Sequence, residues 1–299
     1  MRATVFDRFG PSDVLRVAEL PDPVPGPGQV RIRVQAAGVQ PFDVAVRRGQ
    51  MPWVNAVFPQ QIGQEYAGVV DRWGEGVTGP AIGTEVLGST MLNGCAELLV
   101  VDAANVVVKP PELDFPAAAA LVAAAQTASG ALAELKVGAG DVLLLHAAAG
   151  SVGTLATQLA RRAGAVVIGT ASPANHDYLR ELGAVPVAYG DGLVEAVRGL
   201  GHRVSVALDA AGGDAIAQSI ALGVDPRRIG TIVDDAAAER HGARSVRAGR
   251  SPARLAEVVA LAAEGDVVMP LRVFAFEEVA AAHETVESRH GRGKVVLAM

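Results

Sequence analysis

The sequence has little cysteine: Cys95 is the only one among 299 residues. A single cysteine excludes an intramolecular disulfide and any cluster of thiolate metal ligands, and it is typical of a reducing compartment, so we expect a cytoplasmic protein. Basic residues are also scarce relative to acidic ones, 26 against 32. The chain therefore lacks the excess of basic residues that a general nucleic-acid binder carries, and we expect no nucleic-acid partner.

Long apolar runs are missing as well. The longest wholly apolar stretch is Ala117–Ala125, whereas a membrane-spanning helix needs about 20 such residues. Asp7 interrupts the region where a signal peptide would need an unbroken apolar segment. We therefore expect neither a membrane partner nor an export signal. Half of the residues are nonetheless hydrophobic, which is enough to form a large core in one or two globular domains.

The first hundred residues indicate short strands separated by turns. Arg31–Ala36 alternates with a period of two, and Glu85–Leu87 and Leu98–Val101 are short runs of strand-forming residues. Pro21–Gly28 can be neither helix nor central strand. Closely spaced strands of this kind predict a partly open, barrel-like β domain.

The pattern changes after residue 111. Asp114 can cap a helix that has Pro116 in its first turn and continues to about Leu135. Beyond Gly138, apolar strand-like runs alternate with helical segments, which predicts βαβ units with a parallel sheet. The strands are expected at 141–146, 165–168, 204–208 and 229–233, with helices at 151–163 and 175–182. A closing strand at 294–297 is expected to return to the first module.

The most informative segment runs from Leu143 to Ala156 and reads as strand, tight turn and helix. Ala147, Gly150 and Gly153 give the three-residue spacing of a dinucleotide-binding fingerprint, with alanine where the first glycine usually stands. Gly150 lets the backbone approach a pyrophosphate, and the first N–H groups of the helix face that anion. A merely close-packed strand-to-helix turn is the alternative.

The end of the next strand distinguishes NADPH from NADH. An NAD site normally places an acidic residue there, on the ribose 2′-hydroxyl, but the segment 168–176 contains no carboxylate. Ser172, Asn175 and His176 could instead hold a 2′-phosphate, so NADPH is the expected cofactor. Alternatively, Ser172 and Asn175 simply cap the helix that follows.

Several further segments carry a family resemblance, and their order along the chain adds to it. They are Gly63–Val70, Asn93–Glu97, Gln126–Ala128, His146–Gly153, Gly169–Ser172, Leu182–Ala184, Asp209–Gly213 and Arg292–Val296. Along essentially its whole length the chain resembles a zinc-independent medium-chain dehydrogenase/reductase of the quinone oxidoreductase type. The resemblance implies an α/β fold in which a GroES-like, partly open β-barrel catalytic domain (1–115 and 265–299) accompanies a Rossmann domain with a doubly wound parallel sheet (116–264).

The resemblance also implies roles for individual residues. Thr127 would lie beside the nicotinamide, Tyr189 against the adenine side, and Lys294 at the closing C-terminal segment. The other residues expected at the cofactor are Ala149, Gly150, Ser151, Val152, Gly169, Thr170, Ser172, Asn175, His176, Ala210 and Gly212. Purely structural roles are open for three of them: a helix-stabilising hydroxyl for Thr127, a strand-end aromatic for Tyr189 and a surface charge for Lys294.

Zinc is not expected, and the catalytic residues are assigned accordingly. Gln64 stands where the alcohol dehydrogenase branch has a histidine ligand, and Cys95 cannot supply the cysteine sets that zinc sites need. The histidines at 146, 176, 202, 241, 283 and 290 show no ligand spacing. We expect Gln40, Tyr66 and Thr127 to serve catalysis, with Tyr66 as a proton or hydrogen-bond donor. Met51, Trp53, Tyr66 and Met91 are candidates for an apolar substrate pocket.

These expectations predict an NADPH-dependent reductase that transfers hydride to a quinone or an α,β-unsaturated carbonyl. The alternatives are a dedicated enoyl reductase of a biosynthetic pathway and a non-catalytic NADPH-binding sensor. A homodimer is expected, with Arg228–Val233 as an edge strand that pairs between subunits. The arginines at 240, 244, 247, 250 and 254 are expected to form one exposed, solvated helical face.

Overall fold

The computed structural model describes residues 1–247, 249–289 and 291–299. The chain divides into two compact units: a β unit, Met1–Ala123 with Ser251–Met299, and a parallel-sheet unit, Ala124–Arg250. Compared with the expected boundaries, the first segment extends further, and the helix at 252–263 falls in the β unit, where it contacts the strand at 107–108. Both units together give the expected α/β fold of a GroES-like domain and a Rossmann-type domain.

Among its described residues, the β unit contains two sheets and four α-helices. Its strands are β1 (Arg2–Phe6), β2 (Leu15–Glu19), β3 (Gln29–Val39), β4 (Gln60–Gln61), β5 (Glu65–Trp73), β6 (Glu85–Ser89), β7 (Leu98–Asp102), β8 (Val107–Val108), β15 (Leu271–Ala275) and β16 (Lys294–Ala298). Its helices are α1 (Pro41–Arg47), the first part of α2 (Phe115–Glu134), α8 (Pro252–Ala263) and α9 (Val279–Glu287).

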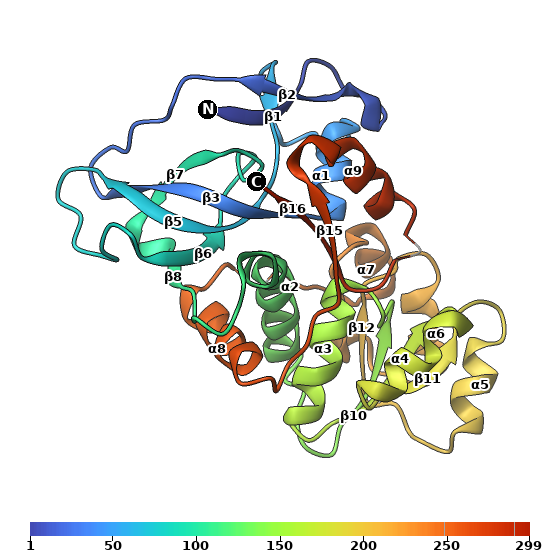
Figure 1. Cartoon of the computed structure of the whole chain (residues 1–299). Helices are drawn as coiled ribbons and strands as arrows, with labels where there is room; N and C mark the ends of the chain where they lie inside the picture. The colour runs from blue at the N-terminus through green and yellow to red at the C-terminus, as the bar shows by residue number, and fades with distance from the viewer. Residues whose placement is uncertain (248, 290) are drawn as a thin grey trace. The chain divides into compact units, whose positions relative to one another are not determined.

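Strand β3 organises this unit. Its alternating residues Val30, Ile32 and Val34 are buried in one apolar cluster, as the period of two predicts. β3 pairs antiparallel with β5, β7 and β16, so the C-terminal strand lies beside a strand from the N-terminal part of the chain (Figure 1). The prediction that the closing strand returns to the first module is therefore confirmed.

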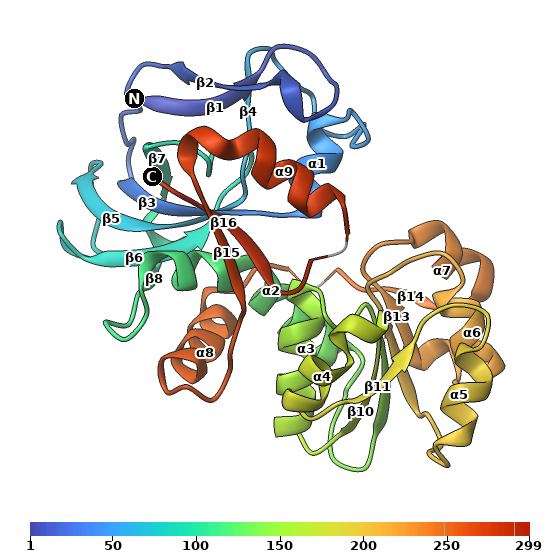
Figure 2. The same cartoon turned by 45° about the vertical axis from the view of Figure 1, so that its right-hand side comes forward.

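The parallel-sheet unit has one six-stranded sheet in the order β11-β10-β9-β12-β13-β14, with every neighbouring pair parallel. Its strands are β9 (Val142–His146), β10 (Val166–Ala171), β11 (Val185–Ala188), β12 (Val206–Asp209), β13 (Ile229–Thr231) and β14 (Arg244–Ser245). Its helices are the rest of α2, then α3 (Ser151–Arg162), α4 (His176–Glu181), α5 (Leu193–Gly199), α6 (Ala215–Ala221) and α7 (Asp235–His241). α5, α6 and α7 share one apolar cluster with the sheet, and α3 and α4 cover its other face (Figure 2).

The expected helices and strands of this unit are present. Strands β11 and β14 and helices α5, α6 and α7 were not among those expected, and two expectations were wrong. Strand β11 contains Pro186, and proline is tolerated there since β11 is an edge strand. The expectation that 228–233 forms an edge was wrong, because β14 pairs with β13 and takes the edge. The arginines from 240 to 254 do not share one helical face, because α7 ends at His241 and β14 and α8 follow.

Helix α2 begins as predicted. The backbone N–H of Ala117 donates to Asp114 Oδ1 at 2.7 Å, so the acidic residue satisfies a free donor of the first turn. In the part of the chain that the structure describes, α2 is the one helix long and apolar enough to cross a membrane, and 72% of that window is buried inside the protein. Its apolar side chains therefore serve packing within the protein.

His283 on α9 has a property that makes the β unit sensitive to acid. It is fully buried, and neither ring nitrogen has a hydrogen-bond partner among the described residues. Burial and, to a smaller extent, the charge of Arg47 lower the pKa of His283 to about 3, and only Glu287 opposes the shift. The folded β unit therefore holds this imidazole neutral, whereas the unfolded chain protonates it below its ordinary pKa of about 6.5.

We expect the free energy of unfolding to fall as the pH drops from 6.5 toward 3, because the unfolded state then binds a proton that the folded state refuses. His283 alone contributes a loss of about 1.4 kcal/mol per pH unit in this range. Urea unfolding at pH 7.5 and 5.5 measures this loss in the free energy of unfolding. The transition is followed by the fluorescence of Trp53 and Trp73, which both lie in the β unit.

The variant His283→Leu should show a smaller loss between these pH values than the unsubstituted protein, by about 1.4 kcal/mol. The matched variant His202→Leu, at an exposed position, should behave like the unsubstituted protein. Equal pH dependence in His283→Leu and His202→Leu would contradict the assignment.

Candidate functional site

The turn after β9 is built as a cradle at the start of α3. Ala147 has a left-handed backbone with φ of 58°, the conformation that favours the glycine usually found at this position. Its N–H donates to Thr170 Oγ1 at 3.1 Å, and the N–H of Ala148 donates to the Thr170 carbonyl at 2.9 Å. The turn is thereby fixed to the neighbouring strand β10.

The two glycines of the turn serve different purposes. A Cβ on Gly153 would lie 2.4 Å from the Ala147 carbonyl oxygen, so the close packing of helix on turn requires glycine there. A Cβ on Gly150 would meet nothing closer than 3.4 Å, so the protein itself leaves space in front of this residue. Gly150 is the N-cap of α3, and the N–H groups of Ser151 and Val152 have no partner within the helix. This open, positively polarised cradle fits a pyrophosphate.

The residues predicted at the end of β10 lie together. Asn175 Nδ2 donates to Ser172 Oγ at 3.4 Å, and His176 Nε2 lies 3.3 Å from the Ala171 carbonyl oxygen. Ser172 and Asn175 stand at the N-cap positions of the 3-10 turn at 173–175 and of α4, but neither makes a side-chain cap hydrogen bond. The neighbouring Asp177 pairs with Arg180 at 2.5 Å.

Asp209 at the end of β12 organises the next loop. Its Oδ1 accepts hydrogen bonds from the N–H groups of Ala211 and Gly212, both at 2.8 Å, and its Oδ2 accepts from the Thr231 hydroxyl at 2.8 Å. The loop that contains Ala210 and Gly212 is thus held in a fixed turn at the same edge of the sheet. This role of Asp209 was not predicted, although an acidic residue followed by small residues at a strand end is a signal for such a turn.

His146 lies beside Asp209 in the parallel register. Its Nε2 is 3.0 Å from Ser219 Oγ. Burial lowers the pKa of His146 to about 4, and the charge of Asp209 only partly opposes this shift. The imidazole is therefore neutral at pH 7 and contributes a hydrogen bond rather than a charge to this edge of the sheet.

The strand order reverses at β9, whose neighbours are β10 and β12. Ligands of doubly wound sheets bind at such a reversal, outside the carboxyl ends of the strands. Three of the segments described above follow the carboxyl ends of strands: the turn at 147–150 follows β9, Ser172 and Asn175 follow β10, and the loop held by Asp209 follows β12. Thr127 is half-buried on α2, and Tyr189, after β11, is 63% exposed. The residues of this unit fit a dinucleotide.

In the β unit, two glutamine side chains form a pair. Gln40, the N-cap of α1, donates from Nε2 to Gln64 Oε1 at 2.8 Å. Gln64 donates in turn to Met91 Sδ at 3.4 Å. Each amide nitrogen carries a second N–H, and the structure gives it no acceptor among the described residues. The Gln40–Gln64 pair can therefore offer hydrogen bonds to a carbonyl oxygen. Gln64 was expected only as the replacement of a zinc ligand, and its hydrogen bond to Gln40 was not predicted.

Two predicted site residues are placed differently from the expectation. Tyr66 is 0% exposed within an apolar cluster, and burial raises the pKa of its hydroxyl well above the ordinary value. This position does not support the predicted role as proton donor. Lys294 is 3% exposed, with Nζ 2.8 Å from Glu65 Oε1 and 2.7 Å from Oε2. Its charge is engaged within the β unit, so we correct its assignment as a cofactor contact.

The candidate pocket residues are spread over different environments. Trp53 and Met91 are exposed, Met51 packs against an apolar cluster, and the Phe42 and Trp53 rings lie 5.5 Å apart. Within residues 1–247, 249–289 and 291–299, no group of three potential metal ligands converges. His290 lies outside the described residues.

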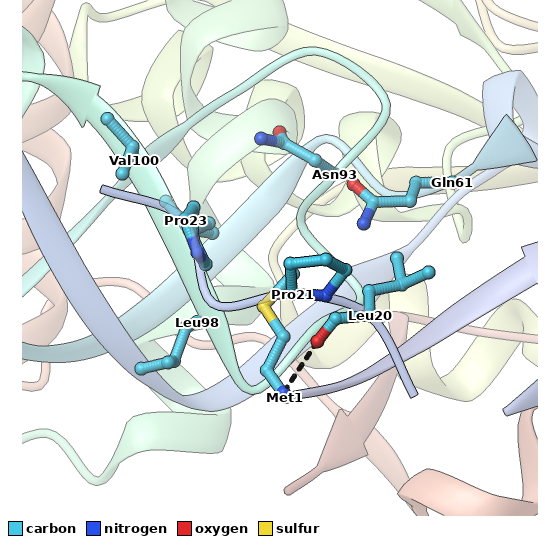
Figure 3. A pocket seen from close by; sticks show the side chains of 9 residues that line it. Met1, Leu20, Pro21, Pro23, Gln61, Asn93, Leu98 and Val100 are labelled. Atoms are coloured by element: carbon cyan, nitrogen blue, oxygen red, sulfur yellow. Dashed lines mark hydrogen bonds between the residues drawn. The ribbon is translucent and has the colours of Figure 1, made fainter. Parts of the chain in front are cut away.

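A hollow of about 300 Å³ in the β unit lies elsewhere (Figure 3). It is lined by Met1, Leu20, Pro21, Pro23, Gln61, Asn93, Leu98, Leu99 and Val100. The α-amino group of Met1 bonds the Leu20 carbonyl oxygen at 2.8 Å and Asp22. None of the predicted catalytic residues Gln40, Tyr66 and Thr127 lines this hollow, so we do not place the reaction there.

Comparisons with known proteins agree with this layout. The family model of the alcohol dehydrogenase GroES-like domain matches residues 26–143, and that described as zinc-binding dehydrogenase matches 182–297. The quinone oxidoreductase from Coxiella burnetii is 31% identical, with a TM-score of 0.90, and the alignment covers 100% of this chain and 99% of that one. The CurK enoyl reductase is 26% identical, with a TM-score of 0.87 and coverage of 100% and 99%.

A curated relative is much longer than this chain. The spectinabilin polyketide synthase system protein NorB of Streptomyces orinoci is 35% identical over 293 residues. That alignment covers 91% of this chain and 13% of NorB, so the chain spans only a small part of the relative's length.

The left-handed Ala147 gives a stability prediction. We expect Ala147→Gly to raise the free energy of unfolding of the parallel-sheet unit by about 1 kcal/mol, because glycine adopts this φ without the clash of a Cβ. Differential scanning calorimetry measures the change. The control Ala148→Gly, at the next buried residue, should instead lower stability by about 1 kcal/mol. Shifts of the same sign in both variants would refute the prediction.

Proposed function

Because the chain belongs to the zinc-independent branch of the medium-chain dehydrogenase/reductase family, we propose that it is an NADPH-dependent reductase of quinones or α,β-unsaturated carbonyl compounds. The observation that carries the proposal is the Gln40–Gln64 pair. At the position where zinc-dependent members of the family hold a histidine ligand, this chain has an amide. Polarisation of the acceptor therefore falls to hydrogen-bond donors rather than to a metal ion.

The reaction balances with one proton from solvent. NADPH would supply the hydride when bound. With an enone, hydride adds to the β-carbon, negative charge moves to the carbonyl oxygen, and a proton then completes the saturated ketone. With a quinone, addition of hydride and one proton gives the hydroquinone. In both cases the amide N–H groups of Gln40 and Gln64 stabilise the oxyanion while it forms, and the protein needs no buried acid such as Tyr66.

The choice of NADPH is supported by the end of β10. Ser172, Asn175 and His176 supply a hydroxyl, an amide and an imidazole, and the segment 168–176 contains no carboxylate. A carboxylate would repel a 2′-phosphate, whereas these groups can donate hydrogen bonds to it. The first basic residue that follows in the sequence, Arg180, is ion-paired with Asp177. The preference for NADPH over NADH therefore depends on the neutral hydrogen-bond donors.

A dedicated enoyl reductase is the second candidate. Its support is the similarity to the NorB polyketide synthase protein over 91% of this chain, together with the CurK enoyl reductase fold. The substrate would then be an enoyl thioester rather than a quinone. The same amide pair would serve, since the thioester carbonyl also becomes an oxyanion after hydride addition.

Activity is measured as the loss of reduced-nicotinamide absorbance with a 1,4-quinone, an acyclic enone and an enoyl thioester, in EDTA. We expect turnover that EDTA does not affect. Gln40→Leu should lower kcat by roughly 10- to 100-fold, because one donor to the oxyanion is lost. Gln35→Leu on β3, in the same unit, should leave kcat within about twofold. Tight NADPH binding without reduction of any acceptor would refute catalysis and favour the sensor alternative.

Cofactor choice is tested by binding alone. Ser172→Asp should weaken NADPH binding by at least about tenfold and NADH binding much less, because the new carboxylate opposes the 2′-phosphate. Fluorescence titration of the reduced cofactors measures both affinities. Ala163→Asp adds the same charge at the exposed far end of α3 and should alter neither. Equal weakening of NADPH and NADH by Ser172→Asp would contradict the proposal.

We also propose a cytoplasmic homodimer. The location is supported by the single cysteine. The dimer rests on the family resemblance, in which sheet edges commonly pair between subunits, and the edge strands of this sheet are β11 and β14. Sedimentation velocity at micromolar concentration should give about twice the monomer mass of 30.6 kDa. A single monomeric species would contradict it.

A further inference from the structure

Three ionisable side chains of the β unit are buried together in a cluster that the proposed reaction does not use. Asp43 and Glu65 are 0% exposed and Lys294 is 3% exposed. Lys294 Nζ lies 2.8 Å and 2.7 Å from the two carboxylate oxygens of Glu65. Asp43 Oδ1 has no hydrogen-bond partner among the described residues. The cluster thus contains two carboxyl groups for one ammonium group.

The surrounding backbone is shaped to hold Glu65. A Cβ on Gly38 of β3 would lie 1.8 Å from Glu65 Oε2 and 3.0 Å from Lys294 Cε, so only glycine leaves room for the ion pair. The N–H of Ala123, in α2, also donates to Glu65 Oε1 at 3.2 Å. The carboxylate is therefore fixed by β3, β16 and α2 together.

The two acids of the cluster are linked to the Gln40–Gln64 pair. Asp43 Oδ2 accepts the backbone N–H of Gln40 at 2.9 Å, and Glu65 directly follows Gln64 in the chain. Each glutamine is therefore anchored, through its own backbone, to one acid of the cluster. The two amide side chains then meet at 2.8 Å.

Stability alone does not account for this arrangement. Burying an ion pair costs desolvation energy, and apolar replacements of similar volume are often neutral or stabilising. A second carboxyl group beside the pair adds to that cost. An ionic cluster connected to the two amide donors can instead fix the orientation of those donors. Its members share hydrogen bonds, so removal of any one of them changes the hydrogen bonds of the others.

We propose that Asp43, Glu65 and Lys294 are positioning residues that fix the orientation of the Gln40–Gln64 amide pair for reduction of the substrate. This inference rests on the proposed function. Lys294 holds Glu65 in place, Asp43 holds the N-cap of α1, and the orientation of the amide donors follows from these two contacts. A displacement of about 1 Å in such donors can cost roughly 100-fold in rate.

The pH dependence follows from the groups that face the cluster: Asp43 of α1, Glu65 of β5, Lys294 of β16 and Cys95 before β7. Burial, with a contribution from the charge of Glu65, raises the pKa of Asp43 to about 7, although the Gln40 N–H and the charge of Lys294 oppose the shift. The pKa of the Cys95 thiol is raised by burial and by both acids. Protonation of Asp43 weakens its hold on Gln40, so kcat should fall as the pH drops through about 7.

The test compares Lys294→Met with Lys109→Met. Lys109 is also buried and also ion-paired, to Glu85 at 2.8 Å, within the same unit. We expect Lys294→Met to lower kcat roughly 10- to 100-fold, to leave the KM for NADPH within about twofold, and to move the acidic limb of the pH profile to higher pH. Lys294→Arg should recover part of kcat, and Lys109→Met should change neither kcat nor the profile.

Asp43→Asn provides a second variant in case Lys294→Met does not fold. It keeps the side-chain shape and should lower kcat while removing the acidic limb, because the titrating group is gone. A folded Lys294→Met or Asp43→Asn protein with kcat within threefold of the unsubstituted protein and an unchanged pH profile would overturn the inference.

A second measurement separates this inference from the proposed function. In protein labelled with ¹⁵N-glutamine, the side-chain amide signals of Gln40 and Gln64 are identified by their loss in Gln40→Leu and Gln64→Leu. These two signals should shift in Lys294→Met and stay in place in Lys109→Met, whether or not any acceptor is reduced. Absence of turnover in the unsubstituted protein refutes the proposed function alone, whereas unshifted amide signals refute the positioning role.

Discussion

The geometry around the Gln40–Gln64 amide pair depends on one long-range interaction, the ion pair between Lys294 and Glu65. The two residues are 229 positions apart, and they meet because β16 pairs with β3 while β5 pairs with the same strand. The C-terminal strand thereby brings a cation to the point where β5 begins. Gly38 leaves the space for it. An ammonium group and a carboxylate that are both out of water must remain together, so the two ends of the chain are tied at the position where the amide pair lies.

The parallel-sheet unit follows a different constraint. Parallel strands align their carboxyl ends, so the turn after β9, the segment after β10 and the loop after β12 are necessarily neighbours at one edge. Polar groups there are satisfied within the protein: Thr170 supports the turn, and Asp209 supports the loop with three hydrogen bonds. What remains free is the start of α3, which is where an anion is expected to bind.

Local patterns predicted much of the chain's secondary structure. The cap at Asp114, helix α3 and the strands β9 and β10 were predicted because each depends on residues close together in the sequence. The prediction was wrong where pairing decided the outcome. Residues 229–231 are not at the edge of the sheet because the two-residue strand 244–245 pairs with them. A strand of two residues has no periodic pattern by which the sequence could predict it. Tyr66 lies in a segment of β5 that is buried on both faces, so no alternation could indicate that its hydroxyl is inaccessible.

The sequence by itself determined the dinucleotide-binding turn, the absence of an acidic residue after β10 and the replacement of a histidine ligand by Gln64, since each is a property of contiguous residues or of residue identity. Only the tertiary structure decided that Gln40 and Gln64 form a pair, that Lys294 serves Glu65 instead of a cofactor and that Asp43 is buried beside them. The physical reason is that ion pairs and side-chain hydrogen bonds between distant residues depend on strand pairing. That pairing follows from the packing of the whole unit.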